Sequence, residues 1–181
     1  MASSSFYDTS FTMLVSMLDS LEALLTKAEA HAKENNIDVN VEYAPARLFE
    51  DMRPLIFQVQ ATSYTIKNFV QTVVGVEVGT WDDNETTFED LFARIKKTRE
   101  LTDSVKPEDL NAKANHKIEA KAGPLNYKTT GIAYASTFTV PNTFFHLQTA
   151  YAILRMKGVP LSKKDYLFPF LAKDPAKPFG Q

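Results

Sequence analysis

The chain has 181 residues, of which 44% are hydrophobic and 23% charged, with a formal net charge of −2. These values are typical of one globular domain with a full hydrophobic core, and the charge balance argues against nucleic acid or an anionic membrane as a partner. The absence of cysteine excludes a disulfide, a thiolate metal site and a thiol nucleophile.

The chain also lacks the patterns that direct a protein to or through a membrane. No apolar run reaches the roughly 18–20 residues that a membrane span needs. The first five residues, Met-Ala-Ser-Ser-Ser, do not begin a secretory signal. We therefore expect a cytoplasmic protein, and the lack of cysteine fits that expectation.

An amphipathic helix is predicted over residues 6–32, because apolar residues recur every three or four positions without an interrupting Gly or Pro. His31 lies in its polar last turn, where we interpret it as a solvated residue that complements the helix dipole. Residues 37–49 alternate between apolar and polar positions at their start, and we expect extended chain there.

A second helix is predicted over residues 54–74, with Pro54 in its first turn and Gly75 at its end. Asp51 lies just upstream, where it can cap the free N–H groups at the helix start. If the residue is itself helical, it can instead line the same cavity as Gln58, two turns further on. Gln58 and Thr62 are four residues apart and form a polar line on this helix. Its inward-facing residues should be Leu55, Val59, Thr62, Ile66, Phe69 and Val73.

The loop that follows contains the only tryptophan, Trp81, and an acidic cluster of Asp82, Asp83 and Glu85. Such a cluster can hold a divalent cation, or it can complement the dipole of the next helix. Thr86 to Glu89 has the spacing of a capping box and predicts the start of a third helix. On that helix Arg94 is expected to face solvent.

Residues 116–122 and 125–129 alternate around a Gly-Pro pair and predict a half-exposed β-hairpin, with His116 exposed at its start. A helix should then run over residues 131–157, stop at Gly158 and kink at Pro141. The tail, residues 158–181, is rich in prolines and aromatic residues, so we expect it to be non-helical and to pack over the helices.

The helix predicted over residues 131–157 contains the most informative polar pair. Asn142 and His146 are four residues apart and share one helix face in an otherwise apolar run. His146 is the only residue of the predicted core whose ordinary pKa lies near neutrality. It is therefore either a proton-transfer group in a pocket or a buried histidine with a purely structural hydrogen bond.

Motifs for nucleotide binding, zinc proteolysis and serine hydrolysis are absent from the sequence. The three histidines fall in different predicted elements, so a three-histidine zinc site is not expected.

Three blocks of sequence carry a family resemblance: residues 46–60, 83–91 and 141–167. They resemble a family of uncharacterised bacterial and fungal proteins placed near the DinB/YfiT-like four-helix bundles. The resemblance implies an all-α fold, a DinB-like four-helix bundle with a small β-hairpin before the last helix. It implies one domain over residues 1–181, a pocket between the helices and a homodimer.

The same resemblance bears on chemistry. Metal-binding DinB relatives place a second histidine four residues after the first on the last helix, and Ala150 stands at that position here. No metal is therefore expected. Some fungal members look like cofactor-free isomerases in aromatic polyketide pathways, where they act in xanthone-type ring formation.

These observations give a leading hypothesis, a metal-free and cofactor-free isomerase that moves a proton on an aromatic polyketide intermediate of the dihydroxanthone type. The alternatives are a non-catalytic small-molecule-binding bundle and a divalent-metal DinB-like transferase. The expected partner is a small-molecule substrate. The predicted catalytic residues are His146 and Asp51, and the predicted substrate-binding residues are Arg47, Gln58, Asn142, Trp81 and Tyr151.

Overall fold

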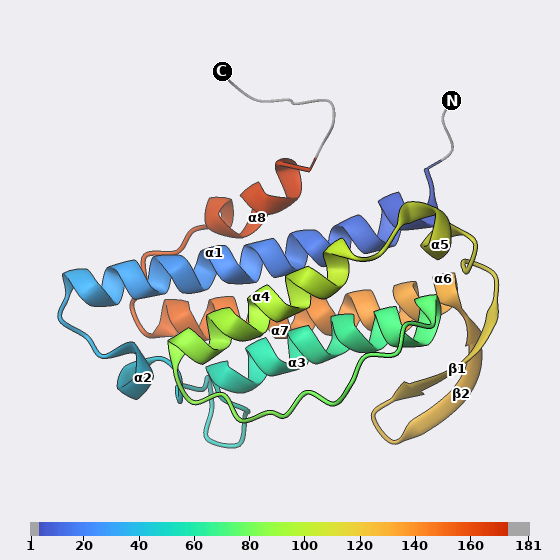
Figure 1. Ribbon diagram of the computed structural model, residues 1–181. Helices are drawn as coiled ribbons and strands as arrows, with labels where there is room; N and C mark the ends of the chain where they lie inside the picture. The colour runs from blue at the N-terminus through green and yellow to red at the C-terminus, as the bar shows by residue number, and fades with distance from the viewer. Residues whose placement is uncertain (1–3, 174–181) are drawn as a thin grey trace.

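The computed structural model describes residues 4–173, and these are mostly helical with one two-stranded hairpin (Figure 1). The four longest helices pack side by side around a shared hydrophobic core. They are α1 (Thr12–Glu34), α3 (Leu55–Phe69), α4 (Phe88–Asp103) and α7 (Val140–Met156). The expected helical bundle with a hairpin is confirmed in this coarse form.

A count of four helices does not describe the fold, because four shorter helices accompany the long ones within the described residues. They are α2 (Val39–Glu42), α5 (Pro107–Asn111), α6 (Gly131–Tyr134) and α8 (Lys163–Leu171). Three π-helical turns extend the long helices: η1 (Tyr7–Phe11), η2 (Val70–Val74) and η3 (Ala135–Thr139).

The long predicted helices lie where the periodicity placed them. The helix predicted over residues 54–74 is α3 followed by η2, and it ends at Gly75, whose positive φ of 87° is the left-handed geometry of a C-terminal stop. All six residues predicted to face inward on it are buried. Near Pro141 the chain passes through η3, where the Val140 N–H bonds to the Ala135 carbonyl, and this wider turn occupies the place of the predicted kink.

Two local predictions were wrong. Residues 39–42 form helix α2 instead of extended chain, because Asp38 caps it by accepting a hydrogen bond from the Asn40 N–H. The capping box of α4 lies one residue later than predicted. Thr87 accepts from the Asp90 N–H, and the Asp90 carboxylate accepts from the Thr87 N–H.

The tail prediction was correct about packing and wrong about conformation within the described residues. Helix α8 begins with a capping box between Ser162 and Asp165 and continues through Pro169. It lies along α1 (Figure 1), where the Ser20 hydroxyl donates to the Tyr166 carbonyl at 2.9 Å and Lys27 pairs with Asp165 at 2.8 Å. These contacts stabilise α8, although Pro169 disfavours a helical conformation at that position. The rest of the tail, residues 174–181, lies outside the described residues.

The predicted hairpin is confirmed as β1 (Lys117–Ala122) paired antiparallel with β2 (Leu125–Thr130). Gly123 begins the two-residue turn with a φ of 57°, which favours glycine. The hairpin leads into α6, η3 and α7, as predicted, but α7 is not the last helix, because α8 follows it. Its base is fixed by hydrogen bonds from the Gly131 and Ile132 N–H groups to the His116 and Ala114 carbonyls.

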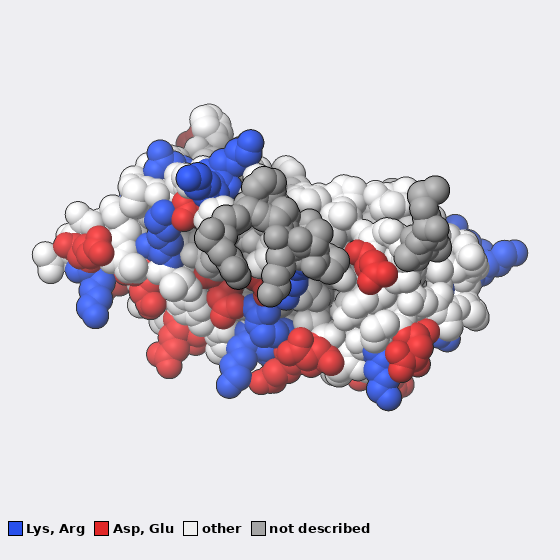
Figure 2. Space-filling model, turned by 90° about the horizontal axis from the view of Figure 1, so that it is seen from above, with Lys and Arg blue, Asp and Glu red and all other residues white. Residues whose placement is uncertain are grey.

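Within residues 4–173, each helix is too short or too polar to cross a bilayer. On the face seen in Figure 2, basic and acidic side chains are interspersed among the described residues, with no field of a single sign.

Gly131 gives a test of the packing between the hairpin base and the helices. A Cβ atom there would lie 2.6 Å from the Lys113 carbonyl oxygen and 3.0 Å from the Val73 side chain. We expect Gly131→Ala to lower the free energy of unfolding by about 1–3 kcal/mol, measured by urea denaturation. Gly79→Ala is the control, because a Cβ there meets open space. Equal stability of the two variants would contradict this packing.

Candidate functional site

Helices α3 and α7 lie side by side and bring together the two polar lines predicted from the sequence. The His146 Nδ1 atom lies 2.8 Å from the Gln58 Oε1 atom, and Gln58 is only 2% exposed. The Gln58 Nε2 atom donates to the backbone carbonyls of Arg53 at 3.0 Å and Pro54 at 3.4 Å, at the start of α3. The two helices therefore meet through a buried amide.

The Gln58 amide determines which nitrogen of His146 carries the proton. A carbonyl can only accept, so the end of the amide that faces Arg53 and Pro54 must be the NH₂ group. The oxygen then faces His146 and accepts from an Nδ1–H group. In the neutral imidazole, this leaves the lone pair on Nε2, which is the atom that can take a proton from a ligand.

The surroundings of His146 favour this neutral form. Its ring makes edge contacts with Phe57 and Phe145, at centroid distances of 5.9 Å and 5.3 Å. Burial among such groups disfavours the charged imidazolium and lowers the pKa of His146 below its ordinary value of 6.5. At neutral pH the side chain is therefore an uncharged base.

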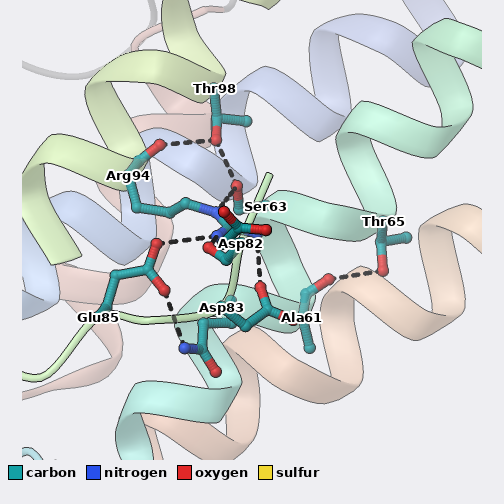
Figure 3. A network of polar contacts seen from close by, with 9 residues as sticks. Ala61, Ser63, Thr65, Asp82, Asp83, Glu85, Arg94 and Thr98 are labelled. Atoms are coloured by element: carbon teal, nitrogen blue, oxygen red, sulfur yellow. Dashed lines mark hydrogen bonds and ion pairs between the residues drawn. The ribbon is translucent and has the colours of Figure 1, made fainter. Parts of the chain in front are cut away.

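Asn142 is oriented by a similar relay from backbone to side chain. The Thr65 hydroxyl donates to the Ala61 carbonyl at 2.7 Å, a contact visible in Figure 3. Its oxygen can then accept from the Asn142 Nδ2 atom, 2.8 Å away. One N–H of the Asn142 amide is used in this bond. The second N–H and the Oδ1 atom remain for a ligand.

His146 and Asn142 share a cavity of about 480 Å³ between α3, η3, α7 and the tip of the hairpin. Its size lies within the usual range for small-molecule sites. The walls are mainly apolar and aromatic, with a few polar groups: Phe57, Ala61, Tyr64, Thr65, Asn68, Lys121, Gly123, Phe138, Asn142 and His146. One base and one amide donor in such surroundings suit proton transfer on a ligand that becomes an enolate.

Two predicted site residues lie outside this cavity. Arg47 and Asp51 are exposed in the segment that leads into α3. Arg47 donates to the Glu50 carbonyl at 3.4 Å. The N-cap of α3 is Pro54, with no side-chain cap, so the capping prediction for Asp51 was wrong. The turn before α3 directs both side chains to solvent, and neither lines the cavity.

The two predicted aromatic walls also lie elsewhere. Tyr151 makes an edge contact with Tyr166 of α8, at a centroid distance of 5.9 Å. Trp81 lies against Arg94 and Lys97, with its ring centre 5.5 Å and 4.6 Å from their cationic groups. Both residues are half-buried, but their contacts belong to packing and to the loop before α4.

Several lining residues did not follow from the sequence hypothesis. Thr65 lies seven residues after Gln58, two helical turns along the same face, so extending that polar line would have found it. Phe57, Tyr64 and Phe138 are aromatic residues that resemble ordinary core positions in the sequence. Lys121 gave no signal, because alternating lysines are typical of exposed hairpins.

The donor atoms near His146 do not form a metal site. Within residues 4–173, no group of three or more His, Asp or Glu side chains is placed to hold an ion. Ala150, one turn after His146, is buried and has no donor atom. His31 contacts the Tyr43 hydroxyl at 3.0 Å, a bond that its interpretation as a merely solvated residue missed, and His116 is exposed, as predicted. The side chains around His146 therefore do not supply the set of donor atoms that a metal ion needs.

The acidic cluster before α4 surrounds the buried guanidinium group of Arg94, as Figure 3 shows. Arg94 is 4% exposed, so the prediction that it faces solvent was wrong. Its guanidinium donates to Glu85 at 2.8 Å, to Asp83 at 2.9 Å and to the Asp82 carbonyl at 2.9 Å. Its Nε atom donates to the Ser63 hydroxyl on α3 at 3.0 Å.

Glu85 extends this network back to α3, because it accepts from the Gln60 amide at 2.9 Å. Burial by itself would raise the pKa of Glu85, but hydrogen bonds from Gln60 and Arg94 outweigh it and hold the pKa below 4.5. The carboxylate is thus ionised beside the guanidinium. The network fixes the loop between η2 and α4 across both helices, which accounts for the acidic cluster without a metal ion.

Comparison with known proteins agrees with this architecture. The model of a family described as "Domain of unknown function (DUF1993)" matches residues 6–167. The crystal structure of a DinB family member protein from Shewanella denitrificans is similar, with 34% sequence identity and a TM-score of 0.80. The similarity covers 89% of this chain and 90% of that chain. A search of curated proteins gives no match.

Removal of Arg94 should destabilise the protein strongly. Glu85 has a side chain only 9% exposed and would keep a buried charge without its cation. We expect Arg94→Leu to cost about 3–5 kcal/mol of unfolding free energy, measured by urea denaturation. Lys96→Leu, an exposed change on the same helix, should cost less than about 0.5 kcal/mol. Similar costs for the two variants would show that the network does not hold the loop.

The protonation state of His146 can be measured directly. We expect ¹⁵N NMR of histidine-labelled protein to show the Nδ1–H tautomer and a titration midpoint below 6.5. Gln58→Leu should remove the preference for this tautomer. An Nε2–H tautomer in the unmodified protein would contradict the assignment of the Gln58 amide.

The same lowered pKa has a consequence for stability. As the pH falls, the unfolded chain takes up a proton at this residue before the folded chain does. The contribution of His146 is therefore fully present above pH 6.5 and is lost as the pH falls toward the lower folded-state pKa. In urea denaturation between about pH 5 and pH 8, His146→Gln should lose less stability on acidification than the unmodified protein. Equal losses would contradict the lowered pKa.

Proposed function

The chain belongs to the DUF1993 family and shares the helical fold of a DinB family member, and on the geometry of the His146 cavity we propose that it is a small-molecule isomerase. The proposed reaction is an acid–base proton transfer on an enolisable, phenolic substrate. The observation that carries the proposal is the bond between the Gln58 oxygen and His146 Nδ1, which leaves the Nε2 lone pair for the substrate.

The proposed reaction needs only these side chains. The Nε2 atom of His146 takes a proton from a carbon next to a carbonyl, and the electrons of the C–H bond form the enolate. The free N–H of Asn142 donates to the enolate oxygen, where developing charge is stabilised most. In a substrate with a double bond conjugated to this enolate, the imidazolium then returns the proton to the far carbon of the extended system, and the double bond shifts. Protons and electrons balance within the substrate, so the reaction requires no cofactor.

The cavity supports an aromatic substrate. Its walls include Phe57, Tyr64 and Phe138, and its volume of about 480 Å³ has room for a flat molecule of two or three fused rings. A dihydroxanthone-type polyketide intermediate, suggested by the family resemblance, has this shape and an enolisable carbonyl. The proposal of a polyketide rests on that resemblance.

The proposed catalysis does not include Asp51, and the proposed substrate binding does not include Arg47, because both side chains lie outside the cavity. A homodimer remains a prediction. Phe145 and Met156, exposed by 60% and 50% on α7, are candidate contacts for a second copy. Sedimentation equilibrium would measure the state of association.

The proposed chemistry is tested by deuterium exchange into β-tetralone, an enolisable bicyclic ketone, in D₂O. We expect the protein to accelerate exchange and His146→Gln to reduce that acceleration by about 10²–10⁴-fold. His116→Gln, an exposed change of the same residue type, should have no effect. The reaction is followed by proton NMR.

The alternatives give different results in the same experiment. Binding of β-tetralone with no acceleration of exchange would favour a non-catalytic binding bundle. Exchange that survived His146→Gln at the original rate would contradict the proposed base. A stoichiometric divalent metal in the purified protein, whose removal stopped exchange, would favour the DinB-like transferase alternative.

A further inference from the structure

The charge of the His146 cavity comes from the hairpin tip. Among the described residues that line the cavity, Lys121 is the one with a permanent charge. His146 is neutral at neutral pH because burial lowers its pKa. No Asp or Glu is among these lining residues. A ligand in this cavity therefore meets a single positive group, at the rim formed by the hairpin.

Lys121 lacks an internal partner for its charge among the described residues. Its cross-strand neighbour is Asn126, which is neutral. Elsewhere on the hairpin Lys128 lies opposite Glu119, with 3.9 Å between their charged groups. No carboxylate of the described residues lies within ion-pair distance of Lys121. Its ammonium group is therefore free to pair with an anionic group on a ligand.

The shape of the cavity places this charge beside an aromatic surface. The lining residues on α3 extend from Phe57 to Asn68, roughly 16 Å at the rise of an α-helix. Phe57 and Phe138 provide flat apolar contacts, and Asn68 adds an amide. A ligand that uses all of these groups is a flat aromatic molecule with one acidic substituent.

We propose that Lys121 is a specificity-determining residue that selects aromatic ligands bearing a carboxylate or phenolate. The inference deepens the proposed function and rests on the same cavity, but it concerns binding and not proton transfer. It places at the hairpin tip a substrate-binding charge, in place of Arg47, which the sequence hypothesis named as a substrate-binding residue.

The test uses two probes of nearly equal shape, a hydroxynaphthoate and the corresponding hydroxynaphthamide, which differ in charge. Isothermal titration calorimetry measures the dissociation constant of each probe. We expect the full-length protein to bind the naphthoate about twofold to fivefold more tightly than the naphthamide, the range for an exposed ion pair. This preference should weaken as salt is added.

Variants of the hairpin assign the preference to one residue. Lys121→Met should abolish the preference for the naphthoate, and Lys121→Arg should keep it. Lys117→Met is the matched control, because Lys117 lies on the same strand and does not line the cavity. It removes the same charge from the protein and should leave the preference unchanged.

Three outcomes would overturn the proposal: equal affinity of the two probes, a preference that survives Lys121→Met, or no binding of either probe to the unmodified protein. The result is separable from the proposed catalysis. A Lys121-dependent preference without deuterium exchange would support this inference and reject the isomerase. Exchange that depends on His146, without a Lys121-dependent preference, would do the opposite.

Discussion

The burial of a positive charge, that of Arg94, is the constraint on which much of this structure depends. A guanidinium removed from water needs acceptors around its whole edge, and a helix can supply few of them. The acceptors come from the loop before α4 and from Ser63 on α3. The loop consequently lies across both helices, and α3 is held on one face by polar contacts as well as by the hydrophobic core (Figure 3).

The opposite face of α3 uses the same kind of contact for a different purpose. There the backbone carbonyls at the helix start orient Gln58, and Gln58 orients His146 on α7. A second relay runs from the Ala61 carbonyl through Thr65 to Asn142. In both cases a backbone carbonyl oxygen, which can only accept a hydrogen bond, determines how the last side chain of the relay is oriented. Rigid elements thus fix the two polar groups, on Asn142 and His146, that line the cavity.

The sequence predicted those parts of the fold and site that depend on helical periodicity. Gln58, Asn142 and His146 were found because residues four apart share a face, and facing polar lines on two apolar helices must meet. The residues whose positions were predicted wrongly are placed by tertiary contacts, which local sequence patterns do not report. Arg94 was expected outside because its carboxylate partners lie in a loop without periodicity. Arg47 and Asp51 precede α3 in a turn whose direction no local pattern determines. In α8, contacts with α1 outweigh the tendency of Pro169 to interrupt a helix.

The hairpin belongs partly to the core and partly to the cavity: Ala120 packs in the hydrophobic core, whereas Lys121 and Gly123 at the tip line the cavity. Both of its ends are bonded at one place, near Ala114 and His116, while its tip reaches the cavity of α3 and α7. Substitutions at the tip alter the cavity wall without touching the core that holds the helices together. Under the proposed function, a change at the hairpin tip alone would alter which ligands the cavity accepts, with the imidazole and its supporting amide unchanged.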